Sequence, residues 1–169
     1  MIIISKGLIL MKTIRFRRKR EGKTNYKKRL ALLKSGKPRL VIRRSNKHIT
    51  LQVVNYDPDG DKVLVTVNSK VLAKKGWKYS TKSLPAAYLA GVLLGKSALE
   101  KGVEEAIVDI GMFHHINGSR LTAAIKGAVD AGLKVPVGDN IFPSDDRLSG
   151  AHISDEVVKS FEKLKKELL

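Results

Sequence analysis

Hydrophobic and polar positions change their spacing along the chain, and these changes divide it into segments. Residues 39–44, 48–55 and 62–68 are rich in Val, Ile, Leu and Thr, and polar or turn-forming residues separate them. The second separating stretch contains Asp-Pro-Asp-Gly at residues 57–60. Short β-branched segments joined by such turns are typical of antiparallel strands. The pattern therefore predicts an antiparallel meander of three strands.

Two helices are predicted in the second half of the chain. Ser83 is a good N-cap residue, and the helix that follows it runs to about Lys101 and stops at Gly102. Its many Ala and Gly residues predict that it lies close against a sheet. Ser119 starts a second helix, because apolar side chains recur at helical spacing after it, and Gly132 ends that helix.

Strand-like segments alternate with these helices. Residues 105–110 have the continuous apolar character of a buried strand. Residues 133–137 predict a short strand at a sheet edge, because Pro136 cannot donate a hydrogen bond to a ladder. A last amphipathic helix is predicted from Ser154 to the C-terminus. A strand meander followed by alternating helix and strand predicts an α/β fold, a layered sandwich with a mixed sheet.

The positive charge is concentrated in the N-terminal part of the chain. The 169 residues contain 33 Lys plus Arg and 16 Asp plus Glu, a formal net charge of +17. Residues 1–48 contain 17 of the bases and one acid, Glu21, whereas residues 49–169 contain 16 bases and 15 acids. This imbalance indicates a polyanionic partner, either a nucleic acid or an anionic membrane surface. We therefore divide the chain into a basic arm, residues 1–34, and a core domain, residues 35–169.

The arm has too few apolar side chains to fold without a partner. Residues 12–29 contain ten bases, and so little apolar surface does not offset the entropy of ordering the backbone. We expect this segment to be extended or disordered until a partner orders it. Residues 30–33 continue a short helix, which the Ser, Gly and Pro of residues 35–38 end.

A membrane is the weaker of the two candidate partners. The longest later apolar run, residues 84–95, has twelve residues, whereas a membrane span needs about 20. The apolar residues 1–10 precede the basic residues, which is the reverse of the order in a signal peptide. We expect a soluble cytoplasmic protein with no membrane partner. The chain has no cysteine, which excludes a disulfide scaffold and cysteine-based metal or redox chemistry.

Six short motifs occur in one order along the chain. They are REGKTNYKKRL at 20–30, RRSNKHITLQVV at 43–54, Gly76-Trp77, PAAYLAG at 85–91, DIGMF followed by Gly118 and Arg120, and DAGLKVPVGD at 130–139. Together they resemble the family of large-subunit ribosomal proteins that binds 5S ribosomal RNA, called protein eighteen in bacteria and protein five in eukaryotes. The arm and everything after Val135 resemble the archaeal and eukaryotic branch of this family.

This resemblance implies a structural constituent of the large ribosomal subunit. Such a protein binds 5S rRNA and helps to attach it to the large-subunit rRNA in the central protuberance. The implied partners are these two RNAs and neighbouring large-subunit ribosomal proteins, and the implied location is the cytoplasmic ribosome. On this interpretation the basic arm becomes ordered on RNA.

The arm supplies cations, polar groups and aromatic rings for a folded RNA. Arginines fork onto phosphate oxygens, lysines add point charges, and aromatic rings stack on unpaired bases. The predicted RNA-binding residues of the arm are Arg15, Phe16, Arg17, Arg18, Lys19, Arg20, Lys23, Thr24, Asn25, Tyr26, Lys27, Lys28 and Arg29. A merely solvated charge run is the alternative, but one acid among seventeen bases does not suit a surface that balances its own charge.

Tyr26 has two alternative roles within the arm. Its ring stacks on an unpaired base, or it packs on Leu30 and Leu33 one and two helical turns further on and nucleates the helix of the arm.

Two clusters outside the arm are further candidates for RNA contact. The first is the first hairpin turn, with Arg43, Arg44, Ser45, Asn46, Lys47 and His48. The second is the loop between the buried strand and the second helix, with Asn117, Ser119 and Arg120. The hairpin gathers cations at one tip, and the loop directs backbone amides and a guanidinium at a phosphate. An ordinary turn and an ordinary strand-to-helix connection are the alternatives.

Two patterns imitate nucleotide and metal sites but lack required residues. Glu-Gly-Lys-Thr at 21–24 imitates the end of a phosphate-binding loop, but Arg17 stands where that motif needs a glycine. The three aspartates at 57, 59 and 61 imitate a calcium loop, but Lys62 occupies the position of its required glycine. We therefore interpret the first segment as part of the arm and the second as a hairpin turn.

His114 and His115, with Asp109 and Asp139, are the remaining candidates for a metal or nuclease site. Neighbouring histidines seldom converge on one ion, and no third spaced ligand follows them. We interpret both histidines as packing or RNA-facing residues, and we expect no metal, no cofactor and no enzymatic activity. A general nucleic-acid or chromatin-binding module and a metal-dependent nuclease remain the alternatives.

Overall fold

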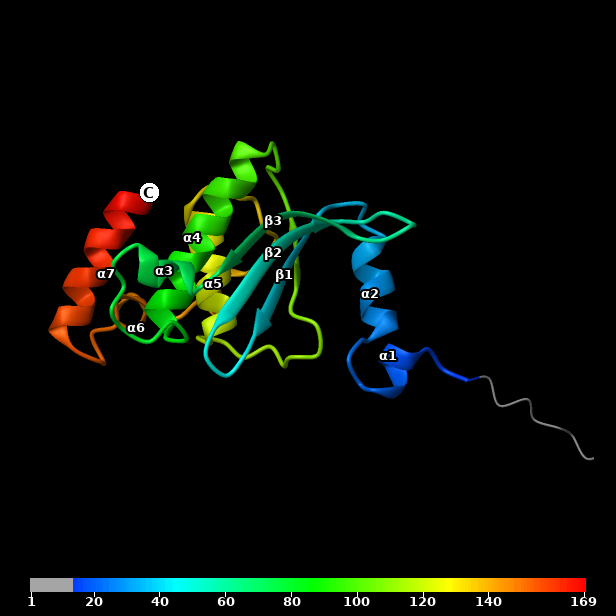
Figure 1. The fold of residues 1–169 in the computed structure, drawn as a ribbon, viewed down its shortest axis with the longest axis horizontal. Coiled ribbons are helices and arrows are strands. Elements are labelled where there is room, and N and C mark those ends of the chain that lie inside the picture. The colour runs from blue at the N-terminus through cyan, green and yellow to red at the C-terminus, as the bar shows by residue number, and fades with distance from the viewer. Residues whose placement is uncertain (1–13) are drawn as a thin grey trace, which may run out of the picture.

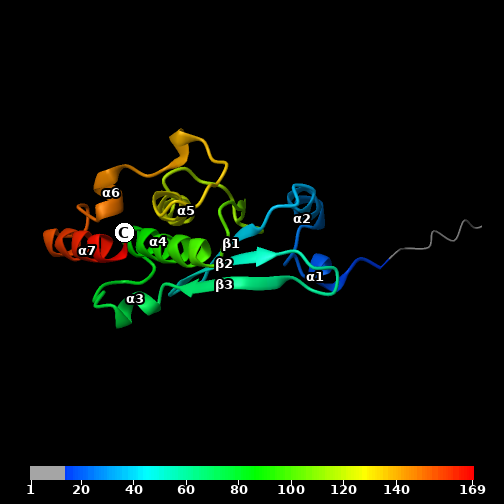
Figure 2. The same ribbon diagram turned by 90° about the horizontal axis from the view of Figure 1, so that it is seen from above.

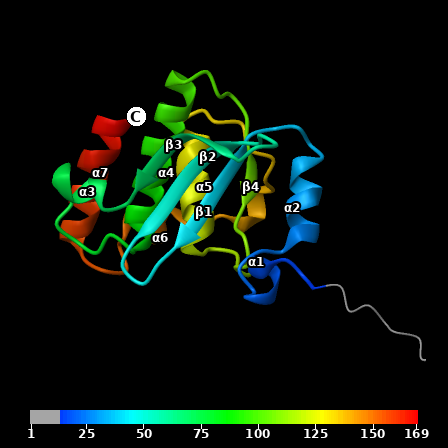
Figure 3. The same cartoon turned by 45° about the vertical axis from the view of Figure 1, so that its right-hand side comes forward.

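A four-stranded mixed sheet forms the centre of the protein. The computed structural model describes residues 14–169, so the first 13 residues of the predicted arm lie outside the described residues. The strands are β1 (Arg39–Arg44), β2 (Ile49–Asn55), β3 (Lys62–Asn68) and β4 (Ile107–Asp109). Their order in the sheet is β3-β2-β1-β4 (Figure 1 labels the first three and Figure 3 all four), with β1 and β4 parallel and the other pairs antiparallel. The predicted meander and the predicted mixed α/β sheet are confirmed.

The two faces of the sheet carry different side chains, because successive residues of a strand point to opposite sides. Leu40 of β1 pairs with Val53 of β2, and both side chains are buried beneath the helices. Arg39 and Arg43 occupy the alternate positions of β1 and point to the other face. We call this second face the outer face.

Helices α4 (Leu84–Glu100) and α5 (Arg120–Asp130) lie on the inner face, behind the strands in Figure 3. Ser83 and Ser119 cap them as predicted, accepting hydrogen bonds from the amides of Ala86 and Thr122. Both helices end within a residue or two of the predicted glycines.

The small residues of α4 pack mainly against α5, whereas the sequence predicted contact with a sheet. A Cβ atom added at Gly91 would lie 2.1 Å from the carbonyl oxygen of Ala124, and one added at Gly127 would lie 2.1 Å from that of Tyr88. The glycines therefore allow backbone-to-backbone contact between the two helices, which a larger residue would prevent.

The predicted strand at 133–137 is wrong. Only an isolated bridge joins Glu105 and Lys134, and the Lys134 amide donates to the carbonyl oxygen of Glu104 over 2.9 Å. Pro136 has no amide hydrogen to extend the ladder. Strand β4 is also shorter than the predicted 105–110, since it pairs with β1 over Ile107–Asp109 alone.

The C-terminal helix was predicted, and three short elements were not. Helix α7 (Asp155–Leu168) begins after Ser154 as expected, and its buried Phe161 lies 5.4 Å from the ring of Tyr88 between centroids. The elements that the sequence did not reveal are α3 (Val71–Lys74), α6 (Asp145–Ser149) and the 3-10 turn Asp139–Ile141. Figure 2 shows α6 and α7 together at the end of the molecule away from the arm.

The described part of the arm is helical, so the expectation of an extended or disordered segment is wrong for these residues. It forms α1 (Arg17–Arg20) and α2 (Tyr26–Leu33). Asn25 caps α2 by accepting a hydrogen bond from the Lys28 amide over 3.1 Å, and Glu21 pairs with both Arg17 and Lys23. These local contacts, together with contacts to the core, order the segment. That residues 1–34 act as a unit ordered on RNA stays a prediction.

Within residues 14–169, no helix combines the length and the apolar character that crossing a membrane requires.

Candidate nucleic-acid interface

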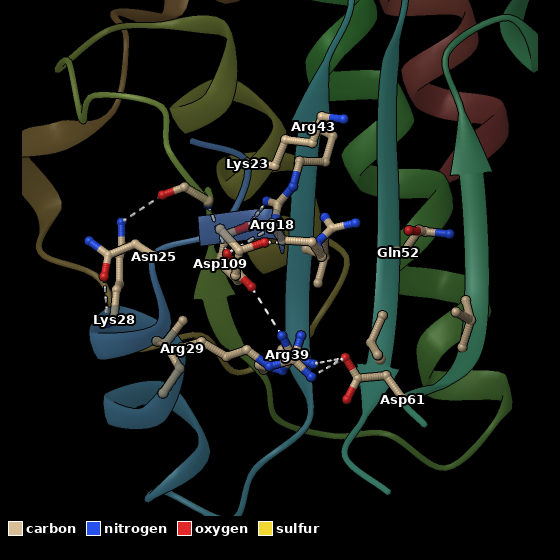
Figure 4. A pocket seen from close by; sticks show the side chains of 16 residues that line it. Arg18, Lys23, Asn25, Lys28, Arg29, Arg39, Arg43, Gln52, Asp61 and Asp109 are labelled. Atoms are coloured by element: carbon tan, nitrogen blue, oxygen red, sulfur yellow. Dashed lines mark hydrogen bonds and ion pairs between the residues drawn. The ribbon is translucent and has the colours of Figure 1, made fainter. Parts of the chain in front are cut away.

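A network of ion pairs joins the arm to the outer face of the sheet (Figure 4). The Arg39 side chain is 4% exposed, and its two terminal nitrogens reach Asp61 Oδ2 over 2.6 Å and Asp109 Oδ2 over 3.1 Å. Arg29 of α2 donates to the same Asp61 oxygen over 2.9 Å. Asp61 therefore connects a residue of the arm with a buried residue of β1.

Asp109 is the second anchor of this network. Its Oδ1 accepts from the Gly111 amide over 2.8 Å and pairs with Arg43 over 3.1 Å. Burial acts to raise the pKa of Asp109, but the charge of Arg43, the Gly111 amide and the charge of Arg39 outweigh it, so the pKa lies below its ordinary value. Asp109 thus stays ionised and holds two guanidiniums on the outer face.

A basic cavity lies between α2 and the outer face. It has a volume of about 230 Å³. The charged residues that line it are Arg18, Lys23, Lys28, Arg29, Arg39, Arg43, Asp61 and Asp109. Six cations against two carboxylates leave a positive site even though part of the charge is paired. Lys28 links α2 to the far wall of the cavity, since its Nζ donates to the carbonyl oxygen of Gly111 over 3.4 Å.

Most predicted cations of the arm face solvent. The predicted cations of the arm that are exposed and form no ion pair within residues 14–169 are Arg15, Arg18, Lys19, Arg20, Lys27 and Lys28. Arg17 and Lys23 are exposed and paired with Glu21. These side chains are available to phosphates, whereas Arg29 is partly held by the core.

The polar residues and aromatic rings of the arm have contacts of their own. Thr24 accepts a hydrogen bond from Arg18 Nε over 2.9 Å, and Asn25 is the cap of α2. The rings of Phe16 and Tyr26 lie 5.3 Å apart between centroids at an angle of 44°. Phe16 is 71% exposed, so this pair links α1 to α2 and still presents an open ring face. The sequence did not reveal Phe16 as the neighbour of Tyr26.

The hairpin tip is an ordered turn with exposed cations. Ser45 Oγ accepts from the His48 amide over 3.0 Å, and His48 Nδ1 lies 2.9 Å from Thr81 Oγ1. Asn46 and Lys47 face solvent. Ser45 and His48 therefore shape the turn, and the exposed residues remain for a partner.

The hairpin and the 112–120 loop lie next to each other. The Arg44 guanidinium sits 5.2 Å from the ring centroid of Phe113 in that loop. A cavity of about 390 Å³ lies between them, with Arg120 and Arg147 also on its wall. The structure therefore joins Arg44 of the hairpin cluster and the 112–120 loop into one surface.

The predicted residues of the 112–120 loop have unequal exposure. Ser119 caps α5, so its hydroxyl is engaged, and Arg120 donates to the carbonyl oxygen of Lys82 over 3.2 Å. Asn117 faces solvent, as do His114 and His115, so packing is not the role of these histidines. In the described part of the chain, no group of three or more His, Cys, Asp or Glu residues is placed to hold a metal ion.

Sequence reasoning missed the roles of Arg39, Asp61 and Asp109. Each belongs to a different element, and only the fold brings them together. A usable signal was present for two of them, because Arg39 stands in a predicted strand of the meander and Asp109 in the predicted buried strand. A charged residue at such a position needs a partner of the opposite sign.

The fold and these surfaces define a class: a basic α/β protein that carries a docked helical arm and presents outward-facing cations to a polyanion. Residues 12–106 match the family model described as "Ribosomal large subunit proteins 60S L5, and 50S L18". A protein named "Large ribosomal subunit protein uL18", from Korarchaeum cryptofilum (strain OPF8), is 53% identical over 141 residues, which cover 83% of this chain and 72% of that protein.

The chain therefore belongs to the uL18 family of large-subunit ribosomal proteins, in its archaeal and eukaryotic branch. It is a structural protein of the ribosome, and its partners include ribosomal RNA. The resemblance identified from the six sequence motifs is confirmed.

Proposed function

We propose that the protein binds 5S rRNA through its basic arm and helps to attach it to the large-subunit rRNA in the central protuberance. The observation that carries this proposal is the basic cavity between α2 and the outer face, with its row of exposed arm cations. A folded RNA offers closely spaced phosphates that such a site can neutralise.

The docked arm reduces the entropic cost of binding. Its helices α1 and α2 are already fixed by the Asn25 cap, by the Phe16–Tyr26 contact and by the pair between Arg29 and Asp61. A preformed cationic surface loses less conformational freedom on binding than a disordered one. The exposed ring of Phe16 adds a face on which an unpaired base can stack.

A comparison of ligands at matched salt tests the proposal. The full-length protein is titrated with 5S rRNA and with duplex DNA of equal length, because both carry phosphate charge but only one has the folded shape. We expect tighter binding to 5S rRNA, and equal binding would favour a general nucleic-acid module. The RNA should stay intact when it is incubated with the protein in magnesium or manganese, whereas cleavage of the RNA would favour a nuclease.

A further inference from the structure

A run of lysines on the core lies outside the basic cavity and was not among the predicted RNA-binding residues. Residues 62–99 contain no Asp or Glu. Within this stretch, five lysines follow β3 through α3 and the loop before α4: Lys70, Lys74, Lys75, Lys78 and Lys82. All five are exposed, and we call them the lysine face. The near balance of charge in residues 49–169, with 16 bases and 15 acids, therefore conceals a local excess of positive charge.

The fold does not use these charges. Within residues 14–169, no ammonium group of the lysine face forms an ion pair or a hydrogen bond. Other lysines of the core do have such contacts, as the pairs of Lys62 with Asp57 and of Lys126 with Asp145 show. Five like charges on one segment repel each other, so the stability of the fold does not explain why they are clustered there.

The segment that carries the lysines is firmly anchored. Leu72 and Trp77 are almost completely buried, and Trp77 Nε1 donates to the carbonyl oxygen of Ser80 over 3.3 Å. Ser69 is fully buried and accepts from the Ile49 amide over 3.0 Å. The lysines therefore extend from a fixed backbone, as a binding surface requires.

Two neighbouring elements border the lysine face. A groove of about 500 Å³ runs between the lysine face and α7, whose wall carries Lys159 and Lys163 balanced by Glu156 and Glu167. At the other end of the segment, Thr81 donates to the carbonyl oxygen of Lys47 in the hairpin tip over 3.0 Å. The surface thus continues from α7 to the hairpin.

The lysine face and the arm lie at different ends of the molecule. Figures 1 and 3 both show α3 on the side of α7 and the two arm helices on the opposite side of the sheet. One RNA helix lying against the arm therefore does not have to reach the lysine face.

The composition of the two regions also differs. The arm combines Arg, Asn and aromatic rings, which suits shape and base recognition, whereas the lysine face contains no arginine. Lysine is a compact point charge that contacts phosphates without regard to base identity. We propose that the lysine face binds the backbone phosphates of a second RNA segment, so that the protein bridges two RNA segments. The identity of this segment rests on the proposed function: it belongs to the large-subunit rRNA.

Binding measurements separate the two surfaces. The variant Lys74→Ala/Lys75→Ala/Lys78→Ala is compared with Lys101→Ala/Lys134→Ala/Lys166→Ala, which removes three other exposed lysines and changes the net charge equally. For isolated large-subunit rRNA, we expect the first variant to flatten the logarithmic salt dependence by about 2 units relative to the control. For 5S rRNA, we expect equal slopes. Equal slopes for the large-subunit rRNA, or equal losses for both RNAs, would overturn the proposal.

Directed cleavage identifies the RNA that each surface contacts. The chain has no cysteine, so single cysteines at Lys78→Cys and Arg20→Cys can carry a tethered iron chelate in assembled large subunits. We expect hydroxyl radicals from position 78 to cut the large-subunit rRNA and those from position 20 to cut 5S rRNA. Cleavage of the same nucleotides from both positions, or no RNA cleavage from position 78, would overturn the bridging surface. If position 78 cuts the large-subunit rRNA and position 20 does not cut 5S rRNA, the result would instead contradict the proposed function.

Discussion

The two faces of the sheet are covered in different ways. On the inner face, α4 and α5 meet so closely that Gly91 and Gly127 touch the backbone of the opposite helix. On the outer face, Arg39 and Asp109 form ion pairs beneath a helical arm whose own cations face solvent. The inner face supplies packing, and the outer face positions charge. The difference teaches that a cationic arm can be ordered without an apolar core of its own, provided the sheet offers carboxylates to hold it.

The largest effect is expected from breaking the ion pairs of the outer face. Asp109→Asn leaves Arg39 and Arg43 without this charged partner, and removal of one member of a buried ion pair costs about 3 to 5 kcal/mol. We expect a loss of stability near the lower end of that range in urea unfolding, since Asp61 still pairs with Arg39. Glu105→Gln is the matched control, because its pair with Lys37 is exposed and should contribute little.

The same substitution should change the dependence of stability on pH. The pKa of Asp109 is lowered in the folded state, so its contribution is present above the ordinary pKa of an aspartate and is lost as the pH falls through the lowered value. Wild type should therefore lose stability more steeply than Asp109→Asn below about pH 4. Parallel stability curves for the two proteins would show that Asp109 does not act through its charge.

An effect of similar size is expected from disturbing the inner face. In Gly91→Ala, the new Cβ meets the backbone carbonyl of Ala124, which cannot move away as a side chain can. We expect a loss of about 3 kcal/mol of stability from overpacking, with 5S rRNA affinity unchanged in the folded fraction. Gly138→Ala is the control, because its φ is −83° and nothing lies within 4 Å of the added atom. Equal stabilities of the two variants would mean that α4 and α5 separate without cost.

Tyr26 tests whether the arm recognises shape as well as charge. Tyr26→Leu should weaken 5S rRNA binding by about 1 kcal/mol, at the low end of the range for base stacking, because Phe16 already lies against the tyrosine ring. Tyr26→Phe should retain most of the affinity, and neither variant should change the salt dependence. If Leu binds as well as wild type while Ala does not, the ring is an internal anchor of the arm.

The arm was the least predictable part of the fold, whereas α4 and α5 were the most predictable. Ser83 and Ser119 begin their helices and glycines end them, so local chemistry determines both boundaries. The helix α2 depends on Asn25 as a cap and on the pair of Arg29 with Asp61, which lie 32 positions apart in the chain. A count of charged and apolar residues does not reveal such long-range pairs.

The sequence predicted clusters of cations, but it did not predict how the fold arranges them. The sequence indicated the arm, the hairpin tip and the 112–120 loop as separate clusters of cations. The structure places the Arg44 guanidinium over Phe113 and so merges the last two clusters, while Arg43 points instead to Asp109 beside the arm. Neighbouring residues of a strand point to opposite faces, so one cluster in the sequence becomes two in the fold.

The smallest expected effect concerns two individual lysines of the arm. Lys27→Ala/Lys28→Ala should flatten the logarithmic salt dependence of 5S rRNA binding by about 1.5 units if both ammonium groups contact phosphates. Lys134→Ala, far from the arm in the chain and paired only with the exposed Glu104, should leave the slope unchanged. An unchanged slope in the double variant would remove these two lysines from the interface.

Deletion of the arm tests the central claim most directly. Residues 35–169 are compared with the full chain in a circular dichroism melt and in a 5S rRNA titration at one salt concentration. We predict a folded core, because the buried cluster between the sheet and its helices lies within these residues, and a loss of roughly 10³-fold in affinity, because the exposed arm cations are gone. A folded core that binds 5S rRNA as tightly as the full chain would contradict the account.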